Sequence, residues 1–422
     1  MTDTTAMRHA IATEPFTCNN RTYHPPARPV VVICLDGCAD EYLDVSLVRG
    51  RMPRLHAVLA GGGYRGRVRG ALPSFTNVNN ASIVTGTPPS EHGISGNFFL
   101  DPETGEEVMM NAATYLRTET ILAKAAQAGR KVAMVTAKEK LRDLLSHDLS
   151  GIAFSAEKAD QAREDTHGIT DVPALVGEET PPIYSAEASL FVLKAGVALI
   201  EQGRADLLYL SLTDYMQHKY PPERPESLDF YEALDRELGR MLDLGAVMGA
   251  TADHGMNAKQ QADGTPNVIY LERLLRKEFG NELRVILPIT DPYVLHHGSL
   301  GSFAVVHLQN GAAADEVARR LIEMEGITEV YDRPTAARKL ELPQDRIGDL
   351  VVLSGRDVVL GRTPEDHDLS NVQTGLRSHG GRYEEMVPLL LSEPLTSEYM
   401  RKASADPRNF DVFDFTINGV QE

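Results

Sequence analysis

Short apolar runs that each end near a polar residue constrain the fold of this chain more than any other feature. The run Val30-Val-Val-Ile-Cys-Leu35 is rich in β-branched residues and ends at Asp36-Gly37. Such a run is typical of a strand buried on both faces, as in a parallel sheet. Similar runs cover residues 131–136, 206–212, 247–252 and 388–391. Together they predict a central sheet that is covered on both sides.

Helical patterns separate these strands. Residues 53–60 begin with proline and are followed by three glycines, which are common signals for the start and end of a helix. Apolar spacing of three or four residues predicts further helices at 120–128, 189–203 and 226–244. Strands that alternate with helices predict an α/β fold with a mostly parallel central sheet flanked by helices.

Residues 262–370 differ from the rest of the chain in their pattern, because short predicted strands and helices follow one another closely. The expected strands cover 283–287, 303–308, 329–331, 350–353 and 358–360, and the expected helices cover 271–279 and 313–325. This pattern predicts a compact α+β insertion. We therefore expect a catalytic core formed by residues 1–261 and 371–422, and an inserted cap formed by residues 262–370.

The charge balance excludes some partners. A formal net charge of -18 over 422 residues argues against nucleic-acid binding, which normally needs a basic face. An acidic protein that handles an anionic small molecule needs a focused site with metals or a few placed lysines and arginines. Three cysteines give no disulfide framework, and no 18-residue apolar stretch or N-terminal apolar segment is present. We expect a cytoplasmic protein that binds neither membrane nor nucleic acid.

Six acidic and imidazole side chains follow the predicted strands. Because ligands gather at the carboxyl ends of strands in open α/β sheets, we expect these side chains to lie together. They are Asp36, Asp214, His218, Asp253, His254 and His379. Taken singly, each also fits a turn, a helix cap or a core position. Taken together they predict a two-metal site, and carboxylate with imidazole suits Zn²⁺ or Mn²⁺.

A hydroxyl nucleophile is expected in the stretch from Leu72 to Gly93. Thr76 stands just before a predicted helix start, where unpaired backbone N–H groups suit an anion such as a phosphoryl group. Ser74, Ser82 and Thr85 are equal candidates on composition alone. The metal candidates at the other strand ends favour Thr76.

These features together resemble the alkaline phosphatase superfamily, in the branch that contains nucleotide pyrophosphatase/phosphodiesterases and phosphonoacetate hydrolases. The resemblance covers roughly residues 30–255 and 377–395. The diesterase motif is Thr-Phe-Pro-Asn-His, followed by Thr-Gly-x-x-Pro-x-x-His-Gly. This chain reads Thr76-Asn-Val-Asn79-Asn80 and then Thr85-Gly-Thr-Pro-Pro-Ser-Glu-His92-Gly93. It departs from the motif at Asn77, Val78 and Asn80, and these departures move the interpretation away from diesters.

The resemblance implies two zinc ions per subunit. One is held by Asp214, His218 and His379, and the other by Asp36, Asp253, His254 and the Thr76 oxygen. It also implies that Thr76 is the nucleophile and that Asn79 donates to a phosphoryl oxygen.

Two lysines indicate which class of substrate to expect. The strand at 131–136 continues into Ala137-Lys138-Glu-Lys140, which is similar to the lysine pair that binds the substrate carboxylate in phosphonoacetate hydrolases. A solvated helix start is the alternative for these lysines. The resemblance implies hydrolysis of the P–C bond of phosphonoacetate to acetate and phosphate, through a phospho-threonine intermediate. Thr76 attacks phosphorus, and Lys138 and Lys140 hold the carboxylate.

Other functions stay open at this point. A phosphodiesterase or nucleotide pyrophosphatase of the same superfamily predicts an aromatic slot for a base and little need for the lysines. A metal-binding scaffold without activity is disfavoured by the complete set of nucleophile and ligands. The expected partner is a small-molecule phosphonate, and a homodimer is the assembly to test.

Overall fold

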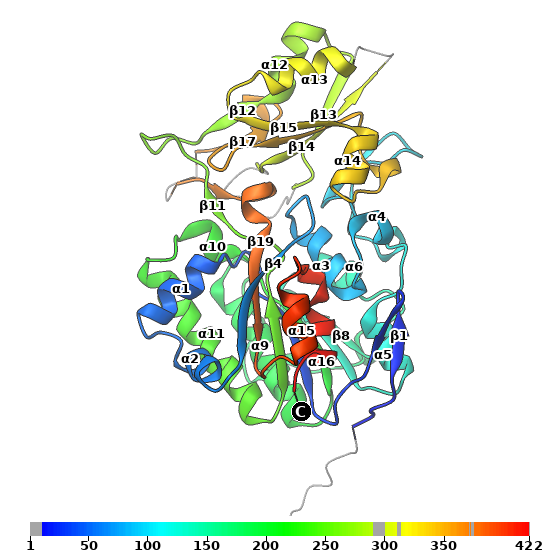
Figure 1. Ribbon diagram of the computed structural model, residues 1–422, viewed down its shortest axis with the longest axis vertical. Helices are drawn as coiled ribbons and strands as arrows, with labels where there is room; N and C mark the ends of the chain where they lie inside the picture. The colour runs from blue at the N-terminus through cyan, green and yellow to red at the C-terminus, as the bar shows by residue number, and fades with distance from the viewer. Residues whose placement is uncertain (1–10, 290–299, 310–313, 371, 373–374, 422) are drawn as a thin grey trace, which may run out of the picture.

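A seven-stranded sheet forms the centre of the computed structural model, which describes residues 11–289, 300–309, 314–370, 372 and 375–421 (Figure 1). From one edge to the other the strands are β4 (Tyr64–Arg69), β19 (Met386–Leu391), β10 (Val247–Thr251), β3 (Val30–Cys34), β9 (Leu207–Ser211), β7 (Val132–Thr136) and β8 (Ile152–Ser155). β19 is antiparallel to both of its neighbours, and the other adjacent pairs are parallel. The predicted mostly parallel sheet is therefore confirmed.

The central strands are buried along their whole length, as their continuous apolar runs predict. Two groups of helices, each with contacts among its own members, enclose the sheet. The first group comprises α1 (Asp40–Val48), α2 (Pro53–Ala60), α9 (Ala186–Glu201) and α11 (Pro225–Asp243). The second comprises α3 (Thr76–Thr85), α5 (Ile121–Gln127) and α16 (Val412–Asn418). The sheet is thus the middle layer of an α/β core.

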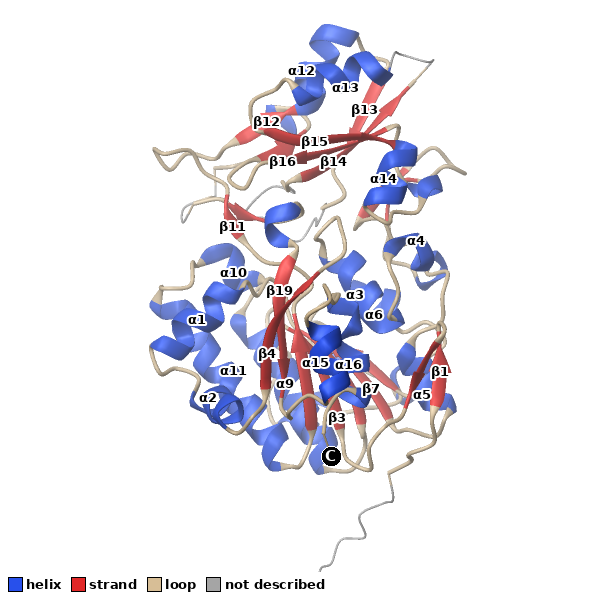
Figure 2. Cartoon of the chain, viewed as in Figure 1, coloured by secondary structure: helices blue, strands red, loops and turns tan. Residues whose placement is uncertain are grey.

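A second sheet lies above the first in Figure 2 and has its own helices. Its strands are, in order, β13 (Leu283–Ile286), β14 (Phe303–Leu308), β16 (Leu350–Ser354) and β15 (Ile327–Asp332), and all neighbours are antiparallel. The helices beside it are α12 (Leu271–Phe279), α13 (Ala314–Ile322) and α14 (Arg333–Lys339). The predicted helix at 313–325 corresponds to α13, and residue 313 lies outside the described residues.

The two faces of this second sheet are buried against different partners. Along β14, Phe303 and Val305 join the main hydrophobic core, whereas Ala304 and Val306 join a separate cluster with side chains of α12 and α13. Alternate residues of a strand point to opposite faces, so one strand serves both cores. The ring of Phe303 packs edge-on against that of Phe75, the residue just before α3, and the two ring centroids are 6.3 Å apart. The second sheet is therefore joined to the region of the site.

A two-stranded neck connects the two sheets. β11 (Asn257–Ala258) follows β10 and pairs antiparallel with β18 (Arg377–Ser378), which precedes β19. The chain thus leaves the core through β11 and returns through β18. The predicted domain limits at 262 and 370 fall just beyond this neck. Among the described helices, none has both the length and the apolar content needed to cross a bilayer.

Candidate active site

Thr76 is the first residue of α3 and lies at the edge of the sheet where the parallel strands end. Phe75 before it is extended, and Gly86 ends the helix in a left-handed conformation with φ of 68°. This position leaves the first backbone N–H groups of α3 without partners inside the helix. The Thr76 hydroxyl oxygen is 3.4 Å from His254 Nε2. The residue predicted as nucleophile therefore lies beside one of the predicted metal ligands.

The other candidate hydroxyls are engaged in the core. Ser74 Oγ donates to the Gly381 carbonyl at 2.9 Å, and Thr85 Oγ1 donates to Ala81 at 2.8 Å. Ser82 Oγ is 2.8 Å from His92 Nε2. His92 is fully buried, and burial lowers its pKa to about 3, so it is a neutral core residue. These contacts favour Thr76 over the other hydroxyls.

The six predicted metal ligands form two groups, and within each group the potential ligand atoms lie within 4.8 Å of one another. The first group contains Asp214, His218 and His379, and the second contains Asp36, Asp253 and His254. All six side chains are buried. Asp36, Asp214 and the Asp253-His254 pair follow β3, β9 and β10, while His218 lies on α10 (Tyr215–Lys219) and His379 follows β18.

The three imidazoles are oriented by backbone carbonyl groups. The Nδ1–H groups of His218, His254 and His379 donate to the carbonyls of Arg377, Gly255 and Ser74, at 2.9, 2.9 and 2.8 Å. A carbonyl only accepts, so the proton of each neutral ring is on Nδ1 and Nε2 carries the lone pair. His218 Nε2 and His379 Nε2 lie 2.8 and 3.7 Å from Asp214 Oδ2. This is the arrangement in which a second hydrogen bond prepares an imidazole to bind a metal.

Asp36 gives the clearest sign that a cation belongs here. Within the described chain, neither of its buried carboxylate oxygens makes a hydrogen bond, and the nearest cationic group is His254, with Nε2 3.3 Å from Oδ1. Burial, together with the negative charges of Asp214 and Asp253, raises the pKa of Asp36 well above its usual value. A buried carboxylate in such surroundings is costly unless a cation pairs with it. The donor set of carboxylates and imidazoles without thiolates suits a divalent ion such as Zn²⁺ or Mn²⁺.

The metal-free protein is expected to lose stability as the pH rises from 6.5 towards 10. Burial alone would lower the pKa of His254, but Asp253 and Asp36 outweigh it and raise the pKa from 6.5 to about 10. The folded chain then holds a proton that the unfolded chain releases in this window, so the stabilising effect is complete below 6.5 and is lost as the pH rises through 10. Calorimetry of the chelated protein should show the midpoint temperature falling across this range. His254→Gln should flatten the slope, and an unchanged slope in that variant would contradict the assignment.

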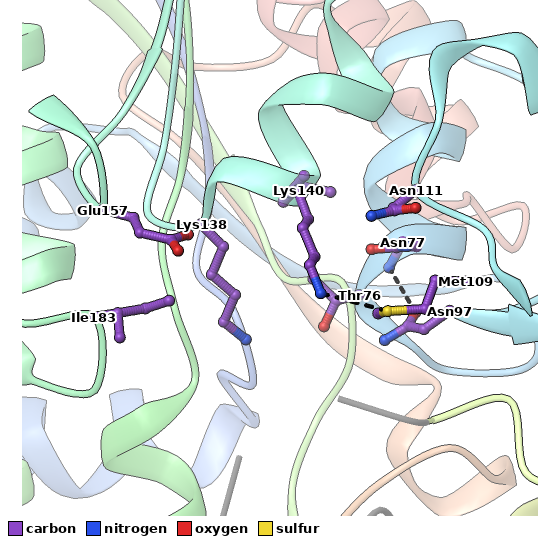
Figure 3. A pocket seen from close by; sticks show the side chains of 10 residues that line it. Thr76, Asn77, Asn97, Met109, Asn111, Lys138, Lys140, Glu157 and Ile183 are labelled. Atoms are coloured by element: carbon purple, nitrogen blue, oxygen red, sulfur yellow. Dashed lines mark hydrogen bonds between the residues drawn. The ribbon is translucent and has the colours of Figure 1, made fainter. Parts of the chain in front are cut away.

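A small pocket of about 50 Å³ opens beside Thr76 (Figure 3). Lys138 and Lys140 extend into it from the start of α6 (Glu139–Leu145). Lys138 Nζ is 3.7 Å from Asp214 Oδ1, and Lys140 Nζ donates to the Met109 sulfur at 3.4 Å. The remaining lining residues are Asn77, Asn97, Asn111, Leu141, Glu157 and Ile183. The pocket therefore brings Thr76 and both predicted lysines together, and Lys138 connects it to Asp214 of one ligand group.

The predicted donor Asn79 does not line the pocket beside Thr76. Its side chain is fully buried, with the Oδ1 accepting from the Ala71 N–H at 2.7 Å and from Asn409 Nδ2 at 2.9 Å. Its Nδ2 donates to the Ala71 carbonyl at 3.0 Å. The same Nδ2 lies 3.4 Å from the Phe75 carbonyl oxygen and 3.5 Å from that of Pro73, so both of its N–H groups face backbone of the turn before α3.

Asn97 is the pocket residue that sequence reasoning missed. Its side chain lines the pocket beside Thr76, and its Oδ1 accepts from the Asn77 N–H at 3.2 Å. This bond leaves the amide nitrogen as the end that can donate to a bound anion. Asn97 stands in Ser95-Gly-Asn97-Phe-Phe, where no periodicity or motif marks it.

Comparison with known proteins shows the family to which the chain belongs. The model of the type I phosphodiesterase / nucleotide pyrophosphatase family matches residues 30–382, so the chain belongs to this family. It is also similar to phosphonoacetate hydrolase from Sinorhizobium meliloti 1021, solved in complex with phosphonoformate and with phosphonoacetate. The identity is 44%, the match covers 96% of this chain and 99% of that one, and the TM-score is 0.90. The predicted resemblance is confirmed.

One more distant solved structure shares the fold, and a curated relative matches part of the sequence. Murine ectonucleotide pyrophosphatase / phosphodiesterase 5 is 17% identical over 92% of this chain and 93% of its own, with a TM-score of 0.62. An ectonucleotide pyrophosphatase/phosphodiesterase of Caenorhabditis elegans is 35% identical over 81 residues, which is 19% of this chain. The match spans only 10% of that relative's length.

Proposed function

We propose that this protein hydrolyses the P–C bond of phosphonoacetate to acetate and phosphate, through a phospho-threonine on Thr76. The observation that carries the proposal is the pocket in which Lys138 and Lys140 flank the nucleophile. The 44% identity to a phosphonoacetate hydrolase supports the same substrate. A dianionic phosphonate that carries a carboxylate would match a site with two metal groups at one end and two ammonium groups at the other.

The proposed metals are two zinc ions per subunit. Asp214, His218 and His379 would hold one, and Asp36, Asp253, His254 and the Thr76 oxygen would hold the other. When bound, the ions would supply positive charge that favours the ionised hydroxyl and neutralises the phosphoryl oxygens.

The side chains of the protein would position the two chemical steps. In the first step the Thr76 hydroxyl gives its proton to solvent and its oxygen forms a bond to phosphorus, while the P–C bond breaks and the carbon keeps the electron pair. Lys138 and Lys140 would hold the carboxylate and stabilise the charge that spreads into it, and water would then protonate the carbon to give acetate. In the second step water attacks phosphorus, which releases phosphate and regenerates Thr76. The amide of Asn97, rather than that of Asn79, would donate to a phosphoryl oxygen.

We propose that residues 262–370 act as a cap over this pocket. Arg284 and Arg362 of that segment lie 3.6 and 3.2 Å from Glu107 oxygens. Glu107 begins β6 (Glu107–Met109), the strand that brings Met109 to the pocket wall. A shift of the cap would therefore reach the wall that faces Lys140. The homodimer and the cytoplasmic location stay predictions.

A phosphodiesterase or nucleotide pyrophosphatase is the second candidate, because the family model carries that description. Against it, none of the described residues that line the pocket is aromatic, so no side chain there would stack on a base. Assays with phosphonoacetate and with a nitrophenyl nucleotide diester should give the higher kcat/KM for phosphonoacetate. A preference for the diester would overturn the proposal.

Removing both lysines tests the substrate assignment. Lys138→Ala with Lys140→Ala should lower kcat/KM for phosphonoacetate by roughly 100-fold or more, because each lost ammonium–carboxylate hydrogen bond costs about 1.5–3 kcal/mol. Hydrolysis of a nitrophenyl phosphate ester, which has no carboxylate, should fall far less. Lys131→Ala is the control, since Lys131 precedes the same strand at its other end and its amine donates to the Gly203 carbonyl. Equal losses for both substrates would remove the lysines from the carboxylate site.

A further inference from the structure

A buried ion pair lies at the neck between the two sheets. Lys259 Nζ is 2.9 Å from Glu384 Oε1, and both side chains are completely buried. Lys259 follows β11, and Glu384 ends the short helical turn η5 (Arg382–Glu384) that precedes β19. The pair therefore joins the chain that leaves the core to the chain that returns.

Glu384 contacts the loops that carry one ligand from each metal group. Its Oε2 accepts from the Gly381 N–H at 3.1 Å, two residues after His379. Its backbone carbonyl accepts from the Gly255 N–H at 2.7 Å, directly after His254. The rings of His254 and His379 stack with centroids 3.5 Å apart and planes 4° from parallel. Glu384 thus holds together the two backbone segments whose spacing sets the distance between the groups.

Lys259 extends this network into the second sheet. Its ammonium also donates to Ser302 Oγ at 2.7 Å and to the Arg356 carbonyl at 2.6 Å, which uses all three of its N–H groups. The Ser302 N–H donates to the His379 carbonyl at 2.9 Å. A residue of the cap segment therefore binds both the buried ammonium and the backbone of a metal ligand.

Stability alone gives little reason for an ion pair in this position. Burying two charges costs solvation energy, and apolar residues of similar size are often as stabilising or more so. What such a pair supplies is a fixed geometry, because each group must keep its few directed partners. The partners here are the ligand loops and the cap.

We propose that the Lys259–Glu384 pair is a positioning unit that fixes the spacing of the two metal groups and couples it to the cap. The inference rests on the proposed function of the two groups as metal sites. Mutating the groups that hold metal ligands in place typically changes metal affinity or activity 10- to 100-fold. The expected effect is on metal geometry and kcat, with little change in KM, because neither residue lines the substrate pocket.

The test compares two variants that each remove one buried ion pair. Lys259→Met with Glu384→Gln removes the neck pair. Arg130→Met with Asp206→Asn is the matched control. Arg130 Nε and Asp206 Oδ1 form a buried pair 2.6 Å apart, and both residues lie just before the starts of β7 and β9, at the ends of these strands away from the site. Three properties are measured: Zn²⁺ affinity by competition with a chelator, the absorption spectrum with Co²⁺, and kcat and KM for phosphonoacetate.

The neck variant should lose about 10- to 100-fold in Zn²⁺ affinity or kcat and show an altered Co²⁺ spectrum, with KM within about threefold of the parent protein. The control should keep its spectrum and kcat within about twofold, whatever its loss in midpoint temperature. Metal affinity, spectrum and kcat all unchanged in the neck variant, or equal losses in the control, would overturn the inference.

Ser302→Ala gives an independent reading if the neck variant does not fold. It removes one partner of Lys259 without changing charge, and it should alter the Co²⁺ spectrum and lower kcat by severalfold. A spectrum and kcat identical to those of the parent protein would again overturn the inference. Failure of the unmodified protein to hydrolyse phosphonoacetate would contradict only the proposed function, because the cobalt spectrum still reports on the neck.

Discussion

Replacing Thr76 with alanine is expected to lower kcat for phosphonoacetate by at least about a thousandfold, because the proposed covalent step then has no nucleophile. The change removes a hydroxyl at the first turn of α3, where the backbone N–H groups and both metal groups remain. Zn²⁺ binding should therefore persist, with at least one ion per chain retained. Phosphate release and metal content, measured on the same preparation, check the two parts.

Thr76→Ser is the matched control for this prediction. A serine hydroxyl can take the same place with one methyl group fewer, so this variant should keep a measurable part of the activity. Substantial turnover by the alanine variant would show that water attacks phosphorus directly, and that a phospho-threonine does not form.

Asp36→Asn is expected to have the second largest effect and to separate activity from stability. The neutral amide is a poor metal ligand, so the second group should lose its ion and kcat should fall by roughly a thousandfold or more. The same change removes one of the two carboxylates that raise the pKa of His254. The stability of the metal-free variant should therefore fall less than that of the metal-free parent protein as the pH rises from 6.5 towards 10.

Asp235→Asn controls for the loss of a buried carboxylate elsewhere. Asp235 accepts from the N–H groups of Arg54 and Leu55, both at 2.8 Å, at the start of α2. This variant should keep both metals and its activity, and it should lose stability because an amide nitrogen replaces one acceptor. Two metals bound to Asp36→Asn, or an unchanged pH dependence of the midpoint temperature for its metal-free form, would contradict the role of Asp36.

The parts of the fold that could be predicted are those in which burial dictates composition. A strand covered on both faces must be apolar throughout, so residues 30–35 and 247–252 marked β3 and β10 within one residue at each end. The same reasoning located the metal candidates, because a polar residue directly after such a strand lies at its carboxyl end. The three histidines and three carboxylates are brought together by the structure as two groups.

Features set by partners distant in sequence could not be predicted. β4 reads Tyr64-Arg-Gly-Arg-Val-Arg69, with a mixed polar pattern that follows from its place at the edge of the sheet. Asn79 matched a motif position, but its role is fixed by Ala71 and Asn409, which no local pattern reveals. Asn97 reaches the pocket because of the path of a loop, and loop paths leave no periodic signal.

The position of β19 has a consequence for the order in which this molecule is assembled. β19 lies between β4 and β10, yet it is synthesised more than 300 residues after β4. During translation the growing core therefore lacks the strand between β4 and β10 until residue 391 has emerged, after β16 has completed the second sheet. Asp36, Asp253 and His254 are all synthesised more than 100 residues before His379, and His379 comes just before β19. The two ligand groups are therefore completed in a fixed order along the chain, and the second is completed only just before the strand that joins β4 to β10.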